Sequence, residues 1–351
     1  MMHADDPGTS IIDSCWPAEA LEVVDYCPYC VSQHRRVAHE NVQDWSFYCA
    51  PGKWTYWSCD SCGSLYLSPR PTPETIGLAY KSYYTHGDSN APLRHRIRDR
   101  LKNEYWSVAL QGDFRPRLHL PRPLQWVIRP LKSHLTDPFA LKELAGLPKG
   151  RVMDVGCGDG SMLEMARGLG WQAVGLEVDD AAVQVARSRG LEVAQGSFLR
   201  LSEYPGEFDC IVCSHVLEHV HEPRTLLLNL YIALKVGGVL LLSSPNAGSQ
   251  VRRHFGNDWR GLEAPRHLSI PSLRQIEKML SGMGFSVRQV LDRPVATGVE
   301  SARIRRRGLR ISSIDTAAAR SLAADLAMPS GEQYDFLELV CVKTGGPETV
   351  R

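Results

Sequence analysis

The sequence predicts an α/β fold, in which helices cover both faces of a mostly parallel sheet, together with a small cysteine-rich unit near the N-terminus. From residue 150 onward, short apolar runs alternate with segments of helical periodicity, as in parallel sheets whose strands are joined by helices. A glycine-rich stretch at residues 152–160 follows the first of these apolar runs, and two Cys-x-x-Cys pairs lie closer to the N-terminus. A chain of 351 residues has room for both units.

The alternation predicts a definite order of strands and helices. Strands are expected at residues 151–155, 172–177, 192–194, 208–214, 238–244, 285–291 and 336–343. Helices are expected at residues 161–169, 180–188, 222–234 and 272–283. Together these segments form a seven-stranded, Rossmann-like sheet with helices on both faces.

Three units are expected along the chain. Residues 1–70 hold an N-terminal segment and the cysteine-rich unit, and residues 71–148 form a helical linker or lid region. Residues 149–351 hold the sheet, with an Arg- and Ala-rich helical insertion near residues 294–332.

Composition limits the partners and the compartment. The formal net charge of +1 produces no global field that would select nucleic acid or an anionic membrane. The N-terminus has neither the basic nor the apolar region of a signal peptide, and no apolar run reaches about 18 residues. We therefore expect a soluble, cytoplasmic protein that does not contact a membrane. Its oligomeric state stays open.

The two cysteine pairs predict a zinc ribbon. Cys27 and Cys30 form the first pair, and Cys59 and Cys62 form the second. Each pair places two thiolates on a tight turn, and two such turns complete the four-sulfur shell of a structural Zn²⁺. The aromatic stretch at residues 47–57 suits a strand or hairpin between the turns. Four reduced cysteines without metal are the alternative interpretation.

The glycine-rich stretch predicts a nucleotide-type cofactor site at a turn from strand to helix. A dinucleotide fingerprint would need a third glycine at position 161, where the chain has Ser161. The chain instead has Asp154, Gly156, Gly158 and Gly160 in a D-x-G-x-G-x-G pattern. This pattern resembles motif I of class I S-adenosylmethionine (SAM) methyltransferases.

That resemblance implies cofactor-binding roles for further residues. Asp154 would organise the glycine loop near the amino-acid part of SAM, although a helix-capping role is also possible. Glu177 follows the second strand, where a carboxylate can accept hydrogen bonds from the ribose hydroxyls. It could also be a surface acid. Ser197 and Phe198 would contact adenine, and Ser214 ends the fourth strand at the ligand-binding edge of the sheet.

Three further segments narrow the resemblance. Residues 62–71, 214–220 and 264–268 look like signatures of a bacterial small-molecule group of methyltransferases (methyltransferase type 23-like) with an N-terminal zinc ribbon. The resemblance implies methyl transfer to a hydroxyl of a small molecule such as a natural product or sugar. Transfer to an amine or a carbon remains open.

Histidines at the substrate edge are the candidate general bases. A hydroxyl acceptor benefits from a base that titrates near neutrality, and histidine fits best. His267 is the first choice, and His215 and His219 are the second. Arg266, next to His267, could hold an acidic group of the substrate. Each histidine taken alone could equally be structural.

A metal site is an alternative use of the same residues. His215, Glu218 and His219 would share one face if a helix began at the strand end, and His267 could join them. A similar acid-x-x-Glu-His set with a later histidine binds the catalytic metal in small-RNA 3′-end 2′-O-methyltransferases and in quinone-pathway O-methyltransferases. There the metal polarises the acceptor hydroxyls.

Two other functions stay open. In an RNA methyltransferase, the ribbon and the arginine runs at residues 94–100 and 303–310 would hold phosphates. The near-neutral charge disfavours this reading. In a non-catalytic SAM-binding or docking module, the ribbon would be an interaction surface, but motif I and the candidate bases argue against that function.

Overall fold

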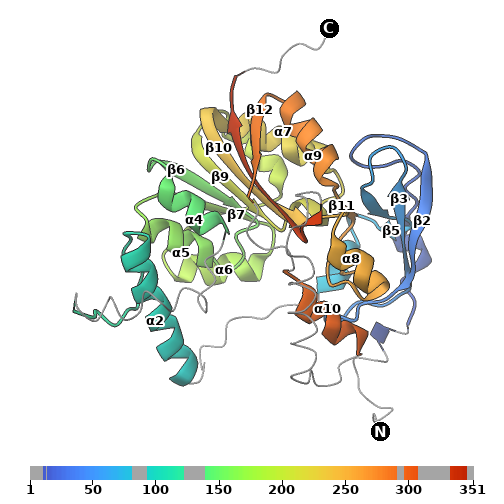
Figure 1. Ribbon diagram of the computed structural model, residues 1–351, viewed down its shortest axis with the longest axis horizontal. Coiled ribbons are helices and arrows are strands. Elements are labelled where there is room, and N and C mark those ends of the chain that lie inside the picture. The colour runs from blue at the N-terminus through green and yellow to red at the C-terminus, as the bar shows by residue number, and fades with distance from the viewer. Residues whose placement is uncertain are drawn as a thin grey trace.

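The computed structural model describes residues 11–12, 14–80, 93–121, 139–290, 296–306 and 333–345 (Figure 1). Most of the predicted insertion at 294–332 therefore lies outside the described residues. The arginine run at 303–310 is described only to Arg306, and most side chains of the run at 94–100 are likewise outside.

The central sheet confirms the predicted α/β architecture. Its strand order is β12-β13-β10-β9-β6-β7-β8. The last five strands in this order run parallel to one another, and β13 runs antiparallel to both β10 and β12. The seven strands are β6 (Arg151–Val155), β7 (Gln172–Glu177), β8 (Glu192–Gln195), β9 (Phe208–Ser214), β10 (Leu234–Pro245), β12 (Phe285–Gln289) and β13 (Phe336–Lys343).

Helices cover both faces of this sheet (Figure 1). One layer contains α7 (Pro223–Ala233) and α9 (Leu273–Gly282), and the other contains α4 (Phe139–Gly146), α5 (Ser161–Gly168) and α6 (Asp180–Ser188). Strand β9 shows why two apolar layers form, because Ile211 and Cys213 face the α7 side while Cys210 and Val212 face the α4 side. Such a two-sided apolar strand is typical of a buried parallel sheet.

Among the described residues, three further helices and several 3₁₀ turns lie outside these two layers. They are α2 (Leu93–Ala109), α8 (Gln250–Phe255) and α10 (Gly298–Arg305), with 3₁₀ turns η1 (Ala18–Ala20), η2 (Ile76–Tyr80), η4 (Phe198–Glu203), η5 (Leu217–His219) and η6 (Gly256–Asp258). Within the described part of the chain, no helix is long and apolar enough to cross a membrane.

A second, antiparallel sheet lies beside the first (Figure 1). Its order is β11-β4-β3-β2, with β2 (Arg35–Val42), β3 (Trp54–Cys59), β4 (Leu65–Leu67) and β11 (Ser269–Ile270). A separate pair joins β1 (Leu21–Glu22) to β5 (Arg70–Pro71). Three strands of the four come from the N-terminal unit, but β11 comes from the segment that follows β10.

The stretch at 47–57, for which the sequence predicts a strand or hairpin, is a strand only in its second half. Strand β3 begins only at Trp54, and residues 45–47 form a turn. The carboxylate of Asp44 is the reason, because it accepts hydrogen bonds from the backbone N–H groups of Phe47 (3.2 Å), Cys49 (3.0 Å) and Ala50 (3.1 Å). The loop is therefore wound around one buried side chain.

Candidate functional site

The glycine loop lies between β6 and α5, where the sequence predicts it. The backbone N–H of Gly156 donates to the carbonyl of Leu176 at 2.7 Å, which draws the loop against the end of β7. Gly160 is the N-cap of α5 at φ +83°, and a Cβ there would lie 2.3 Å from Cδ1 of Leu191. The side chain that accepts from the first N–H of α5 is that of Asp159, whose Oδ1 lies 3.1 Å from the nitrogen of Ser161. The carboxyl group of Asp154 lies buried at the end of β6.

Glu177 organises the loop through three backbone groups. Its Oε2 accepts from the N–H of Gly158 at 2.8 Å, and its Oε1 accepts from Val178 (2.8 Å) and Asp179 (2.9 Å). A carboxylate offers about four acceptor positions, so room for a further donor remains. Burial, followed by the nearby charge of Glu177, raises the pKa of Asp154 to about 7.

The other predicted cofactor residues reach the same edge of the sheet. Ser197 is the exposed N-cap of η4, and Phe198 is half-buried against the core. The backbone N–H of Gly196 donates to the carbonyl of Glu177 at 2.8 Å and holds the β8 loop against the β7 loop. Ser214 ends β9. The fold thus gathers the carboxyl ends of β6 to β9, the place where open α/β sheets bind ligands.

Glu218 is a fully buried carboxylate beside this edge. Its Oε2 accepts from the hydroxyl of Ser244 at 3.0 Å, and its Oε1 lies 3.2 Å from Nδ1 of His215. Burial alone would raise its pKa, but the hydrogen bond and charge of His215, with His219 and His267 nearby, lower it to about 2. The group is therefore an anion held away from water.

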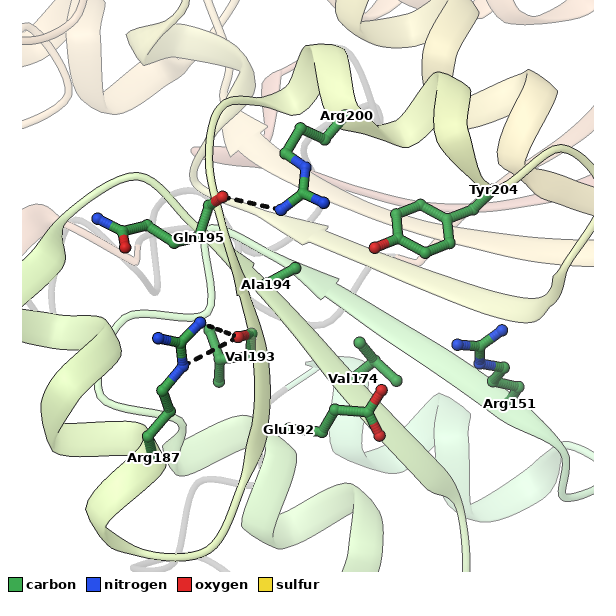
Figure 2. Close-up of a pocket in the computed structure, with 9 residues that line it drawn as sticks. All are labelled: Arg151, Val174, Arg187, Glu192, Val193, Ala194, Gln195, Arg200 and Tyr204. Atoms are coloured by element: carbon green, nitrogen blue, oxygen red, sulfur yellow. Dashed lines mark hydrogen bonds between the residues drawn. The ribbon is translucent and has the colours of Figure 1, made fainter.

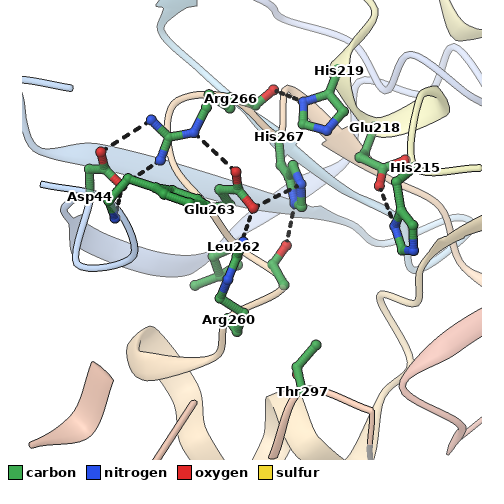
Figure 3. Close-up of polar contacts among 12 residues, drawn as sticks. Asp44, His215, Glu218, His219, Arg260, Leu262, Glu263, Arg266, His267 and Thr297 are labelled. Carbon is green, nitrogen blue, oxygen red and sulfur yellow. Dashed lines mark hydrogen bonds and ion pairs between the residues drawn. The ribbon is translucent and has the colours of Figure 1, made fainter. Parts of the chain in front are cut away.

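His219 and His267 face this carboxylate (Figure 3). Nδ1 of His267 lies 2.7 Å from the carbonyl of Gly261, and Nδ1 of His219 lies 3.1 Å from the carbonyl of Arg266. A carbonyl oxygen only accepts, so each Nδ1 carries the proton and each Nε2 keeps a lone pair. The hydroxyl of Tyr80 lies 3.0 Å from Nδ1 of His219.

These three residues fit a divalent cation. One ligand atom each from Glu218, His219 and His267 lies within 4.8 Å of the others. A carboxylate with two neutral imidazoles is a donor set that Zn²⁺, Fe²⁺ or Mn²⁺ accepts. Backbone carbonyls that fix the remote ring nitrogen are the usual support for such ligands.

His215 does not join this group, contrary to the predicted set of four. It has left-handed backbone geometry (φ +56°), and its ring makes a T-shaped contact with Phe336 at 4.8 Å. The 3₁₀ turn η5 starts only at Leu217, so the expected helix face does not form. His215 instead hydrogen-bonds to the outer side of Glu218.

His267 is buried, and its pKa is lowered. Burial lowers the pKa of this imidazole to about 4, against the opposing charge of Glu263. The Nε2 atom lies 3.5 Å from Oε2 of Glu263. The ring is therefore neutral near pH 7, with a lone pair that can accept a proton or bind a metal.

The expectation that Arg266 could hold an acidic substrate group is wrong. Its side chain is fully buried, with Nη1 3.1 Å from Oδ2 of Asp44 and Nε 3.1 Å from Oε1 of Glu263. Both carboxylates are internal, so the guanidinium is already paired. Neither Glu263 nor Asp44 is among the residues predicted from the sequence. The spacing of Glu263, four residues before His267, was an available signal, whereas nothing marked Asp44.

The four cysteines of the N-terminal unit converge. Their sulfur atoms lie within 4.8 Å of one another, with Cys27 Sγ 3.6 Å from Cys62 Sγ and Cys30 Sγ 3.4 Å from Cys59 Sγ. The N–H of Gly63 donates to the carbonyl of Cys59 at 2.8 Å, which closes the second turn. Four convergent sulfurs fit the closed shell of structural zinc.

A hollow of about 350 Å³ lies elsewhere (Figure 2). Its lining includes Arg151 and Glu192, the first residues of β6 and β8. It extends along the whole of β8 to Gln195, and Glu218, His219 and His267 are not among its lining residues. Its Arg187 and Arg200 already donate to the carbonyls of Val193 and Gln195.

Known proteins show the same class of domain. Residues 129–290 match the family described as "Methyltransferase domain". A ubiquinone biosynthesis O-methyltransferase from Xanthomonas campestris pv. campestris is 36% identical over 123 residues, which cover 32% of this chain and 52% of that protein. One from Albidiferax ferrireducens is 32% identical over 157 residues, covering 42% and 55%. The chain thus spans about half the length of these curated relatives.

Solved structures include similar chains. A SAM-dependent methyltransferase from Archaeoglobus fulgidus has a TM-score of 0.40 and 16% identity, over 62% of this chain and 97% of that one.

The matched family covers residues 129–290, which hold the glycine loop and most of the central sheet. This part of the chain is a methyltransferase domain of the class I, SAM-dependent type.

Proposed function

We propose that this protein transfers a methyl group from SAM to a hydroxyl of a small molecule, at a site formed by Glu218, His219 and His267. The observation that carries the proposal is the convergence of their ligand atoms within 4.8 Å, next to the sheet edge that holds the glycine loop. The matched relatives are named as O-methyltransferases, which supports a hydroxyl acceptor.

The glycine-loop side would bind the donor. Gly156, Gly158 and Gly160 let the backbone approach SAM, while Asp154 lies near its amino-acid part. Glu177 would accept from the ribose hydroxyls, in addition to the Gly158 N–H that it already holds. Ser197 and Phe198 would lie against adenine, and Ser214 would close the pocket from β9. All of these positions lie at one edge of the sheet.

Methyl transfer from a sulfonium is an in-line displacement. The bond between carbon and sulfur breaks as the bond between carbon and the acceptor oxygen forms, and the hydroxyl loses its proton. The protein has to align the three atoms and accept that proton. His267 can accept it at Nε2, because Nδ1 already donates to Gly261 and Glu263 lies 3.5 Å away to stabilise the imidazolium.

A divalent cation is a second candidate on the acceptor side. Glu218, His219 and His267 would hold it, and when bound it would polarise the acceptor hydroxyl and lower its pKa. Two observations favour this variant: a ring nitrogen of each histidine lies within 4.8 Å of an ionised, buried carboxylate, and the pKa of His267 is low for a general base at pH 7.

The zinc ribbon would have a structural role. The four sulfurs of Cys27, Cys30, Cys59 and Cys62 leave no open position. The same unit could instead hold RNA phosphates, which would require strongly salt-dependent binding.

The test measures transfer of labelled methyl from SAM to a panel of phenols, catechols, hydroxylated sugars and RNA, with and without added divalent cation. We expect turnover with a hydroxylated small molecule. Glu218→Gln should lower kcat by about 10²-fold or more, while Glu222→Gln, an exposed neighbour, should match the wild type.

Three outcomes would reject parts of the proposal. Tight SAM binding with no turnover of any acceptor would indicate a non-catalytic module. Turnover of RNA alone would indicate an RNA methyltransferase. Full activity in chelator, with the ribbon zinc retained, would eliminate the cation and leave His267 as the base.

A further inference from the structure

The segment that carries His267 belongs, by its hydrogen bonds, to the sheet of the N-terminal unit. Strand β11 begins two residues after His267 and pairs with β4, where Ser269 lies opposite Tyr66 and Ile270 opposite Leu65. The backbone N–H of Leu67 extends this pairing by donating to the carbonyl of Leu268 at 2.9 Å. His267 is therefore held next to the four-stranded sheet, whereas Ser214 ends a strand of the central sheet.

Tyr56 fastens the same segment from β3. Its fully buried hydroxyl lies 2.7 Å from the carbonyl of His267 and also reaches the carbonyl of Leu262. Burial raises the pKa of this phenol well above its usual value, so it keeps its proton and remains a donor. One side chain of the N-terminal unit thus holds both ends of the loop around Glu263.

Asp44 adds a buried ion-pair chain. Its carboxylate lies 3.1 Å from Nη1 of Arg266, whose Nε lies 3.1 Å from Oε1 of Glu263. The second oxygen of Glu263 lies 3.5 Å from Nε2 of His267 (Figure 3). A buried guanidinium that loses one carboxylate must seek another partner. Removal of Asp44 would therefore displace Glu263 and change the surroundings of the His267 lone pair.

The cysteine cluster touches the other end of this segment. The hydroxyl of Ser272 donates to the carbonyl of Cys62 at 2.6 Å, and its N–H donates to the hydroxyl of Ser64 at 3.0 Å. Ser272 is the N-cap of α9. The geometry of the second cysteine turn therefore sets where α9 begins.

We propose that the N-terminal unit is one half of the active site, with Asp44 and Tyr56 as positioning residues that orient His267 toward Glu218 and His219. This inference rests on the proposed function, because it assigns His267 to the acceptor side. Asp44 and Tyr56 do not touch the reacting atoms. They act through Arg266 and through the backbone of residues 262–267.

The test compares Asp44→Asn with two matched variants. Asp60→Asn removes an exposed ion pair with Arg36 on the same unit, and Asp209→Asn removes a carboxylate that holds the Arg151 N–H at the opposite edge of the sheet. The measurements are kcat, the KM for SAM, the zinc content, and the Nδ1–H resonance of His267 in the NMR spectrum of the full chain.

We expect Asp44→Asn to lower kcat tenfold or more, with the KM for SAM within twofold of wild type and zinc retained. The His267 Nδ1–H resonance should shift, because its ring environment changes. Asp60→Asn and Asp209→Asn should leave kcat and this resonance unchanged. A folded Asp44→Asn protein with wild-type kcat and an unmoved resonance would overturn the proposal.

Tyr56→Phe keeps the test decisive if Asp44→Asn fails to fold, since it removes only one hydroxyl. A smaller loss of kcat with the same shift of the His267 resonance supports the proposal, and a wild-type resonance overturns it. If the wild-type protein methylates no acceptor, the proposed function fails. The resonance would still show whether Asp44 and Tyr56 orient His267.

Discussion

The donor side and the acceptor side of the candidate site are built in different ways. On the donor side, Glu177 holds the N–H of Gly158, which is 19 residues away in the sequence, and two residues that follow it directly. On the acceptor side, Arg266 pairs with Asp44 across 222 residues, and Tyr56 reaches His267 across 211. The first half is one βαβ unit. The second half exists only where two sheets meet.

This difference predicts that substitutions on the acceptor side lower kcat, whereas substitutions on the donor side weaken the binding of SAM. The largest effect is expected for His267→Gln. It removes the imidazole that would accept the proton or bind the cation, so kcat should fall by about 10³-fold, or ~4 kcal/mol of barrier. The Kd for SAM, measured by calorimetry, should stay within twofold. His254→Gln, an exposed histidine outside the site, is the control, and a raised Kd with unchanged kcat would contradict the division.

The second prediction concerns the stability of the donor side. Gly160→Ala should lower the free energy of unfolding by about 3 kcal/mol, because it combines a left-handed φ with a Cβ 2.3 Å from Leu191 Cδ1. Gly158→Ala has φ +53° and no neighbour within 4 Å, so it should cost about 1 kcal/mol. Denaturant unfolding measures both values. Equal losses would show that close packing at Gly160 is unimportant.

The third prediction isolates the loop carboxylate. Glu177→Gln places an amide NH₂ near backbone N–H groups, so it should raise the Kd for SAM about tenfold, or ~1.4 kcal/mol, with kcat at saturating SAM nearly unchanged. Asp180→Asn changes an exposed acid of the adjoining helix and should have no effect. A large loss of kcat without a change in the Kd for SAM would show that Glu177 acts in the methyl transfer and not in SAM binding.

The fourth prediction is a pH dependence of SAM affinity, which needs no change in sequence. The pKa of Asp154 is raised to about 7 by burial and by Glu177, so its carboxyl group is protonated below that pH. Cationic SAM would favour the carboxylate, so its binding should release a proton. Affinity should therefore rise by up to about tenfold per pH unit toward pH 7 and level off above it. Asp154→Asn should remove this slope, whereas a flat wild-type profile would refute the role.

The raised pKa of Asp154 also makes the stability of the folded protein depend on pH. The folded pKa of Asp154 is raised above its usual value of 3.8, so the folded chain binds a proton more tightly than the unfolded chain. The contribution of this group to stability is present below pH 4 and is lost as pH rises to about 7. Bound SAM should reduce that loss by stabilising the carboxylate.

Sequence patterns predicted the central sheet closely. The predicted limits of β6, β7, β9 and β13 agree with the observed ones, since apolar strands flanked by turns are defined by local residues. Strand β10 begins at Leu234 rather than at 238, because Leu234 pairs with Phe208 before a register shift. That pairing depends on the neighbouring strand.

The candidate acceptor site was predicted only in part. The histidines at 219 and 267 were identified from their position after strands, and the structure brings both beside Glu218. His215 was placed with them on an assumed helix, but its left-handed backbone turns it outward. Arg266 was interpreted as free for substrate because the sequence does not show that Asp44 lies against it.

The sequence by itself determined the class of fold, the glycine loop and the four-cysteine cluster, because each depends on short spacings and on the alternation of apolar residues. Only the tertiary structure decided that β11 joins the N-terminal sheet, so that His267 is held by residues about 200 positions earlier. The physical reason is that buried polar groups must find partners. The buried polar groups of residues 261–272 find many of their partners in the N-terminal unit, at Asp44, Tyr56 and the second cysteine turn.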